Sequence, residues 1–121
     1  MSDAFHDREK SFEAKYKLDS EFKFKAHSRR NKLIGLWAAE RMGMTSAEAA
    51  AYAKAVVIVD LEEPGDDDVV RKLVTDMTAR GAPVSETVVR DELDRQMAIA
   101  VEQVSQEYPK ALGPDHEPVG G

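Results

Sequence analysis

The sequence predicts an all-α fold, a small antiparallel four-helix bundle, on three observations. Glycine and proline divide the 121 residues into pieces of helical length, with breaks at Gly43, at Pro64-Gly65 and at residues 81–83. Residues typical of helix ends flank these breaks. Within the pieces, apolar residues recur every three or four positions. A chain of this length is expected to form one domain around one modest core.

The first helix of the bundle is expected over residues 20–42, because Gly43 supplies a residue that readily adopts the left-handed conformation ending a helix. When successive residues are placed at steps of about 100°, several large apolar side chains share one arc. We expect this arc to face the core. Its members are Leu18, Phe22, Ala26, Leu33, Leu36 and Trp37.

The second helix is expected over about residues 46–61. Thr45 and Glu48 have the spacing of a capping box, which opens a helix. Residues 56–59 are all β-branched and, taken alone, are also compatible with a short buried strand. They lie inside a longer stretch of good helix formers with no turn signal before it, so the sequence favours helix.

The third and fourth helices are expected to begin at Asp66 and Ser85, each acting as an N-cap. Asp67 and Asp68 then place negative charge at the positive end of the third helix, which ends at Gly81. The apolar positions expected to face the core are Val69, Val70, Leu73 and Met77 in the third helix and Val89, Leu93, Met97, Ala100, Val104 and Tyr108 in the fourth.

Both ends of the chain are expected to lie outside the bundle, which spans residues 20–108. Residues 109–121 contain six glycines and prolines and are predicted to form a disordered tail. Residues 1–19 are predicted to form a separate, mobile, amphipathic segment.

The argument for that separate segment comes from the positions of its aromatic residues around the helix axis. Phe5, Phe12 and Tyr16 align with one another, but on an arc about 80° from the one expected to face the core. One straight helix does not present both arcs to the same surface, so we place a division near residues 18–20. An aromatic stripe on a charged helix is typical of helix-in-groove recognition. Two other readings stay open: the aromatics fold back onto the bundle, or the segment is a frayed terminus.

Composition excludes several classes of protein. The absence of cysteine excludes a disulfide scaffold, a thiolate zinc site and a cysteine nucleophile, and it favours a cytoplasmic location. No stretch has the length and hydropathy of a membrane span or a signal peptide. The net charge is −6: residues 1–42 carry ten basic and seven acidic side chains, and residues 43–121 carry seven and sixteen. An acidic body argues against nucleic-acid binding and favours a protein partner.

No residue pattern indicates catalysis, a metal or a cofactor. His6, His27 and His116 are scattered rather than grouped as ligands. The aspartates at residues 66–68 do not match a calcium loop, because Met77 stands where the bidentate glutamate is required. Phosphate-binding glycine motifs and nucleophile motifs are also missing. We therefore expect a protein that is not an enzyme.

A second contact surface is expected in residues 22–32, where aromatic and basic residues alternate. We place Phe24 and Arg29 away from the core arc, in a small exposed patch. As residues of a nucleotide or secondary protein contact we name Phe24, Arg29, Arg30 and Lys32. The alternative function is then a small helical domain that senses ATP or ADP by weak binding. Titration with either nucleotide, followed by amide chemical shifts, separates this alternative from protein binding, since it requires shifts at millimolar ligand.

Several motifs of the first 40 residues occur together in one known family. They are Asp7-Arg8-Glu9, Phe12-Glu13-Ala14-Lys15, Phe24-Lys25-Ala26, Arg29-Arg30-Asn31-Lys32-Leu33 and Gly35-Leu36-Trp37-Ala38-Ala39-Glu40. On these residues the chain resembles the zeta subunit, the inhibitor of the F-type ATP synthase of alpha-proteobacteria, over about residues 5–105. Two stretches depart from the family pattern: Tyr16-Lys17-Leu18, which leaves the strength of inhibition open, and the more apolar Ile58-Val59.

The resemblance implies a four-helix protein that binds the catalytic head of the synthase, made of alpha, beta and gamma subunits, and blocks rotation in the direction of ATP hydrolysis. It implies a cytoplasmic protein held at the inner membrane only through the synthase. It also implies that the N-terminal segment is the inhibitory part. Carried over residue by residue, the expected contact set is Phe5, Arg8, Glu9, Phe12, Glu13, Lys15 and Tyr16.

Overall fold

The computed structural model describes the backbone of residues 2–111 and the side chains of residues 20–107. This part of the chain consists of four helices and contains no strand: α1 (Ser2–Arg41), α2 (Ser46–Glu62), α3 (Asp66–Ala79) and α4 (Glu86–Ala111). The predicted all-α, four-helix fold is confirmed. Residues 56–59 lie within α2, so the strand alternative is excluded there.

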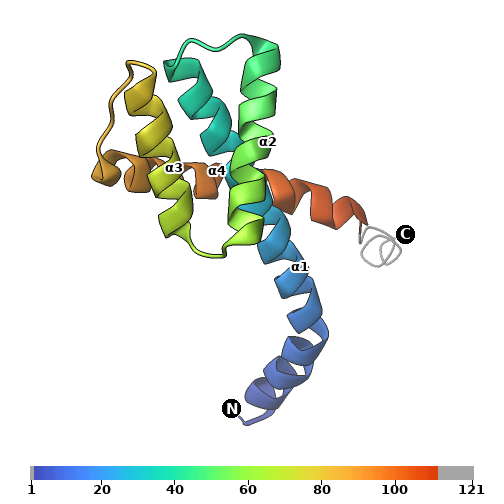
Figure 1. Cartoon of the computed structure of the whole chain (residues 1–121). Coiled ribbons are helices and arrows are strands. Elements are labelled where there is room, and N and C mark those ends of the chain that lie inside the picture. The colour runs from blue at the N-terminus through green and yellow to red at the C-terminus, as the bar shows by residue number, and fades with distance from the viewer. Residues whose placement is uncertain (1, 112–121) are drawn as a thin grey trace.

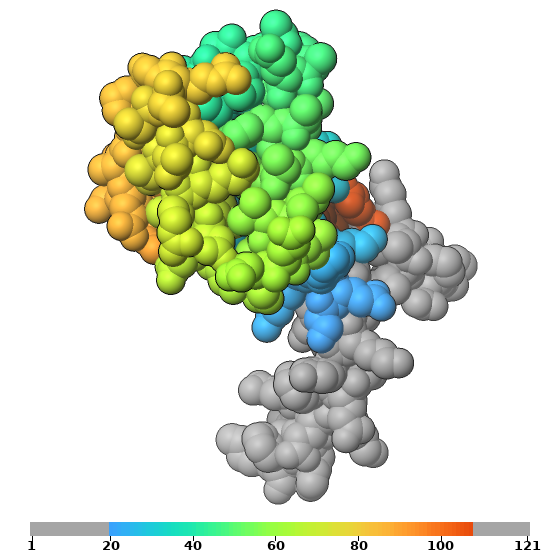
Figure 2. Space-filling model, in the orientation of Figure 1, coloured from blue at the N-terminus to red at the C-terminus, as the bar shows by residue number. Residues whose placement is uncertain are grey.

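The helices α1, α2 and α3 run in alternating directions, and α4 crosses behind them (Figure 1). Figure 2 shows α2 and α3 side by side on one face, with α1 emerging beneath the end of α2. The central element is α1, which contacts all three other helices and packs most extensively on α2 and α4. At the other end, α4 includes residues 109–111, which the sequence placed in the tail; residues 112–121 lie outside the described part.

Most helix ends form as the sequence predicts. The Thr45 side chain accepts a bond of 3.2 Å from the Glu48 amide, and the Glu48 carboxylate accepts one of 2.9 Å from the Thr45 amide, which confirms the capping box. The Ser85 hydroxyl accepts a bond from the Val88 amide. The N-cap of α3 is Gly65, with a φ of 116°, and not Asp66 as predicted. Asp66 is instead the first helical residue, and its side chain binds elsewhere.

The core lies where α1 meets the other helices. The buried residues that form it are Ile34, Ala38, Met42, Val56, Val69, Val70, Leu73, Met77, Val89 and Leu93. All four core positions predicted for α3 are buried. In α4, Val89, Leu93, Ala100 and Val104 are buried, Met97 is half-buried, and the side chain of Tyr108 lies outside the described part.

The arc predicted to face the core in α1 is only partly correct. Ala26 is buried, but the large side chains of the predicted arc are half-buried: Phe22, Leu33, Leu36 and Trp37. The most deeply buried residues are mainly small ones on another arc, where neighbouring helices approach closely. Among them are Ile34, Gly35, Ala38 and Ala39. The prediction ranked residues by size and hydrophobicity, whereas close packing against two helices selects small side chains.

This result removes the angular argument for a division near residues 18–20, because the arc on which it rested is not the most buried one. The α1 backbone is also continuous through those residues. Figure 1 shows the first half of α1 projecting beyond the other three helices. The side chain of Leu18 lies outside the described part. A functionally separate segment of residues 1–19 therefore stays a prediction, supported by this projection and by the family resemblance.

The contact between α1 and α2 is closest at Gly35. A Cβ atom at this position would lie 2.6 Å from the Cα atom of Ala53 and 3.3 Å from a methyl carbon of Val56. Since the first of these atoms is backbone, it cannot move aside as a flexible side chain would. Only glycine permits the two helices to lie this close together.

Alanine at position 35 is expected to lower the free energy of unfolding by about 1–3 kcal/mol, because the added carbon forces α1 and α2 apart. In an exposed helix the same substitution raises stability by up to about 1 kcal/mol. The sign of the change thus reports the close contact. Urea unfolding of Gly35→Ala, followed by circular dichroism, measures it, and an unchanged or raised midpoint would contradict the packing described here.

Candidate functional site

The contact set implied by the family resemblance maps to the projecting half of α1. Its residues span Phe5 to Tyr16, about 16 Å of helix at 1.5 Å per residue. The backbone there is helical, whereas the side chains lie outside the described part. The structure therefore gives the helical backbone of this contact set, and the arrangement of its side chains stays a prediction.

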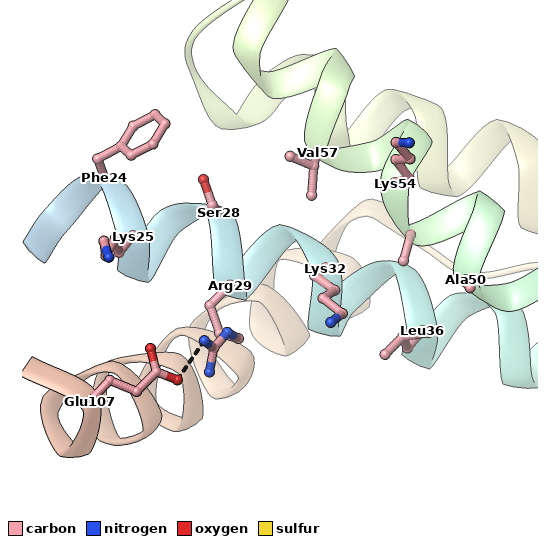
Figure 3. A pocket seen from close by; sticks show the side chains of 11 residues that line it. Phe24, Lys25, Ser28, Arg29, Lys32, Leu36, Ala50, Lys54, Val57 and Glu107 are labelled. Atoms are coloured by element: carbon pink, nitrogen blue, oxygen red, sulfur yellow. Dashed lines mark hydrogen bonds and ion pairs between the residues drawn. The ribbon is translucent and has the colours of Figure 1, made fainter. Parts of the chain in front are cut away.

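A groove of about 720 Å³ opens along the bundle half of α1, between α2 and the end of α4 (Figure 3). We call it the α2–α4 groove. Its residues are Phe24, Lys25, Ser28, Arg29, Lys32 and Leu36 of α1, Ala50, Ala53, Lys54 and Val57 of α2, and Glu107 of α4. Three of the four residues predicted as a secondary contact, Phe24, Arg29 and Lys32, lie in it.

Positive charge dominates this groove. Arg29 donates bonds of 2.8 Å to the Gln103 side chain and 2.7 Å to Glu107, which holds its guanidinium against α4. Lys32 and Lys54 are exposed and form no ion pair within residues 20–107. At one end Phe24 is 59% exposed, the largest exposed fraction among the large apolar side chains of that range. The expected exposure of Phe24 is confirmed, whereas Arg29 is mostly turned against α4.

Arg30 does not belong to the groove, which corrects the prediction that grouped it with Arg29 and Lys32. Arg30 is only 3% exposed. The guanidinium donates bonds of 2.8 and 3.1 Å to the Asn31 side chain and one of 2.9 Å to Asp66 at the start of α3. Asn31 in turn donates to Asp60 of α2 over 2.8 Å. This network ties α1 to α2 and α3, so Arg30 supports the fold.

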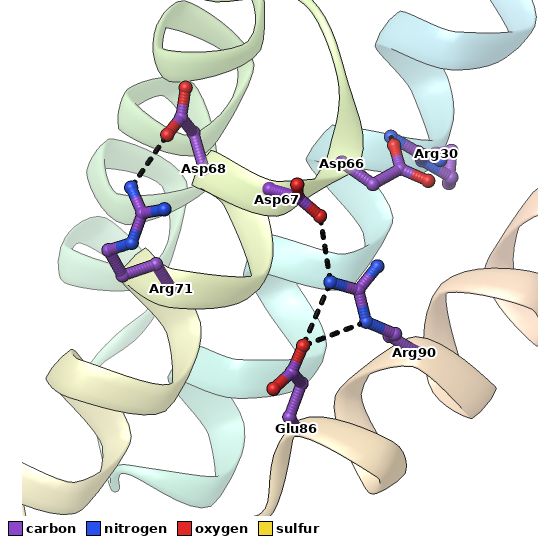
Figure 4. Close-up of polar contacts among 7 residues, drawn as sticks. All are labelled: Arg30, Asp66, Asp67, Asp68, Arg71, Glu86 and Arg90. Carbon is purple, nitrogen blue, oxygen red and sulfur yellow. Dashed lines mark hydrogen bonds and ion pairs between the residues drawn. The ribbon is translucent and has the colours of Figure 1, made fainter.

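The acidic start of α3 is used in the same way (Figure 4). Arg90 of α4 binds Asp67 over 2.8 Å and Glu86 over 2.9 Å. The hydrogen bond and the charge of Arg90 lower the pKa of Asp67. Arg71 binds Asp68 over 2.8 Å. Asp66 and Asp67 thus join α3 to α1 and α4, whereas Asp68 pairs within α3.

Other polar groups also have structural partners. The Tyr52 hydroxyl donates a bond of 2.8 Å to Asp76, which also pairs with Lys72 over 3.0 Å. Burial, and then the bond to Asp76, raise the pKa of Tyr52 far above its usual value. His27 is exposed, and its Nδ1 lies 3.2 Å from the Lys23 carbonyl of its own helix. Within the described residues no group of three or more His, Cys, Asp or Glu side chains is placed to hold a metal ion.

Sequence reasoning missed the walls of the α2–α4 groove, which are Lys54 and Val57 on one side and Glu107 on the other. Periodicity assigns residues to faces of a helix but does not say which helices flank that face. One signal was present in the sequence: Lys54 is the only basic residue between Arg41 and Arg71, inside a largely apolar helix. Ile58, one of the departures from the family pattern, is 43% exposed and so adds to the surface rather than to the core.

The described residues place the chain in the class of small all-α bundle proteins, with one helix projecting from the bundle. Comparison with known proteins gives the family. The chain belongs to the family ATPase inhibitor subunit zeta, whose model matches residues 1–103. The resemblance found in the sequence is thereby confirmed, and membership supports an inhibitory, regulatory role.

One similar structure was determined by NMR in solution. It is 45% identical in sequence, covers 70% of this chain and 96% of the other, and has a TM-score of 0.62. A search of curated proteins finds no significant match. Across the described residues, no helix combines the length and apolar character needed to cross a membrane.

The substitution Asp66→Asn is expected to lower the free energy of unfolding by about 1–3 kcal/mol, because Arg30 would keep its buried charge and lose its anionic partner. Asp67→Asn is a matched control in the same helical turn, and its side chain is 81% exposed. We expect little change there. Chemical denaturation of both variants measures the difference, and equal effects would argue against a special role for the Arg30 network.

Proposed function

We propose that the protein inhibits ATP hydrolysis by an F-type ATP synthase, by binding the catalytic head of alpha, beta and gamma subunits and blocking its rotation in the hydrolysis direction. The observation that carries this proposal is the family match over residues 1–103, which includes all of α1. The projection of α1 beyond the bundle supports the proposal that the N-terminal segment makes the inhibitory contact.

Such an inhibitor needs no chemistry of its own. A rotary ATPase passes each catalytic interface through open and closed states. A helix that fits one of these states better than the others lowers the free energy of that state and arrests the cycle. The protein then acts through the difference between its affinities for the two states, not through its total affinity.

The size of the required effect is compatible with the proposed contact set. To move a two-state balance from 1:99 to 99:1, the affinities must differ by about 5.5 kcal/mol. An aromatic side chain fully desolvated in a pocket contributes on the order of 2 kcal/mol or more. Phe5, Phe12 and Tyr16 together reach the required range when they are desolvated in only one of the two states, with Arg8, Glu9, Glu13 and Lys15 placed around them to fix orientation.

The proposed location follows from the partner. The protein would lie in the cytoplasm, at the periphery of the inner membrane, and be held there through the synthase. Its contacts would be with the head and not with lipid.

No contact in the described residues favours the alternative function, a weak sensor of ATP or ADP. It relied on Arg29, Arg30 and Lys32 as phosphate ligands. Arg29 is engaged with Gln103 and Glu107, and Arg30 is buried with Asn31 and Asp66. Nucleotide binding therefore stays a prediction, and inhibition is the function that we propose.

Removal of residues 1–18 is expected to abolish inhibition while leaving the bundle folded, because the core residues lie in residues 26–104. The measurement is ATP hydrolysis by the isolated head with increasing full-length or truncated protein. Circular dichroism and thermal melting verify that the truncated protein keeps its helices. Full inhibition by the truncated protein would refute the proposed mechanism.

A finer variant keeps the chain length. Replacing Phe12 by alanine is expected to raise the half-inhibiting concentration about 30-fold, the equivalent of 2 kcal/mol. Ser11→Ala changes the adjacent residue outside the contact set and serves as the matched control. If both variants inhibit like the unchanged protein, Phe12 is not an anchor.

A further inference from the structure

We propose that the α2–α4 groove binds an acidic, amphipathic helix of the catalytic head, as a second contact beside the N-terminal segment. This inference rests on the proposed function. It adds a site on the bundle and a stated partner chemistry.

The shape of the groove fits a helix. The helices α2 and α4 pack on two sides of α1 and leave a third side open, lined by Ser28, Lys32 and Leu36. The α1 floor from Lys25 to Leu36 is about 16 Å long, or three helical turns. The walls are helices whose backbone groups are bonded within each helix, so the groove offers no strand edge for pairing. A partner must be recognised through side chains, as in helix-in-groove binding.

The floor and the rim have different chemistry, which defines the face that a partner must present. Leu36, Ala50, Ala53 and Val57 give an apolar floor and wall, and Phe24 closes one end with an exposed ring. An apolar stripe of a partner helix would remove this surface from water. The partner is therefore amphipathic.

The charge of the rim determines the charge that the partner must carry. Lys32 of α1 and Lys54 of α2 stand along the groove with no ion pair inside residues 20–107, and Arg29 lies beside them. Glu107 is the single acidic residue among those that line it. This cationic surface belongs to a chain of net charge −6. Carboxylates flanking the apolar stripe of the partner would complement it.

Continuity with the proposed inhibitory contact identifies the head as the source of that helix. Tyr16 and Lys25 lie on the same unbroken helix, about 14 Å apart along its axis. A head that holds residues 5–16 therefore has part of its surface beside the groove. Two contacts on one continuous helix reinforce each other, since the first raises the effective concentration for the second.

The first test combines inhibition with charge reversal. Lys32→Glu and Lys54→Glu together are expected to raise the half-inhibiting concentration for ATP hydrolysis by the head about tenfold or more. The control is Arg71→Glu with Arg95→Glu, which changes net charge equally at two exposed positions away from the groove. Thermal melting verifies that both double variants are folded. Equal inhibition by the two double variants would overturn the groove proposal.

The second test identifies the occupant directly. A zero-length carbodiimide joins a lysine amine to a carboxylate in ion-pair contact, and mass spectrometry locates the joined residues. In the complex of full-length protein and head, Lys32 and Lys54 are expected to join Asp or Glu residues of a helix of the head. The double variant Lys32→Arg, Lys54→Arg keeps the positive charge but has no amine at either position, so it is expected to lose these crosslinks.

The outcomes separate the two proposals. If the unchanged protein does not inhibit the head, the proposed function fails. If it inhibits but Lys32 and Lys54 yield no crosslink to the head, the groove proposal fails and the function stands. Crosslinks to Asp115 or Glu117 of the same chain would show that residues 112–121 occupy the groove, and they too would overturn the proposal.

Discussion

The close contact of α1 and α2 at Gly35 is the constraint on which the rest of the structure depends. With no side chain at this position, the Ala53 backbone approaches α1 directly. Ala53 also lines the α2–α4 groove, one residue from Lys54. The same contact that builds the core therefore sets the distance between the floor of the groove and its α2 wall. A larger residue at position 35 would displace that wall together with the lysine it carries.

The polar network of Arg30 and Asn31 explains how one short motif serves two purposes. In the four consecutive residues Arg29-Arg30-Asn31-Lys32, the middle two are buried and the outer two lie at the surface. Arg30 and Asn31 point inward and bind Asp66 and Asp60, so they fix α2 and α3 on α1. Arg29 and Lys32 lie in the groove. The inward pair holds in place the helix that presents the outward pair.

Local sequence signals predicted the helices well, because caps and breaks act over a few residues. Thr45 with Glu48 and the stripe of α3 are examples. The face of α1 could not be predicted in the same way. A pattern of large apolar residues finds a helix that packs on one side, whereas α1 packs against α2 and α4, and small residues such as Ala38 and Gly35 occupy the contacts. The groove was partly found through Phe24 and Lys32, but its α2 and α4 walls depend on tertiary packing.

The continuity of α1 changes the energetics of the proposed N-terminal contact. A separate segment of 19 residues would have to nucleate its own helix, and a nucleation constant near 10⁻³ corresponds to about 4 kcal/mol. As an extension of a helix already fixed in the bundle, the same residues need only propagate it, because the turns from residue 20 onward provide the nucleus. Ordering on binding normally subtracts from affinity. The bundle would thus contribute to the proposed inhibitory contact even where it does not touch the head, and the proposed helix in the groove would strengthen this contribution by holding that nucleus against the partner.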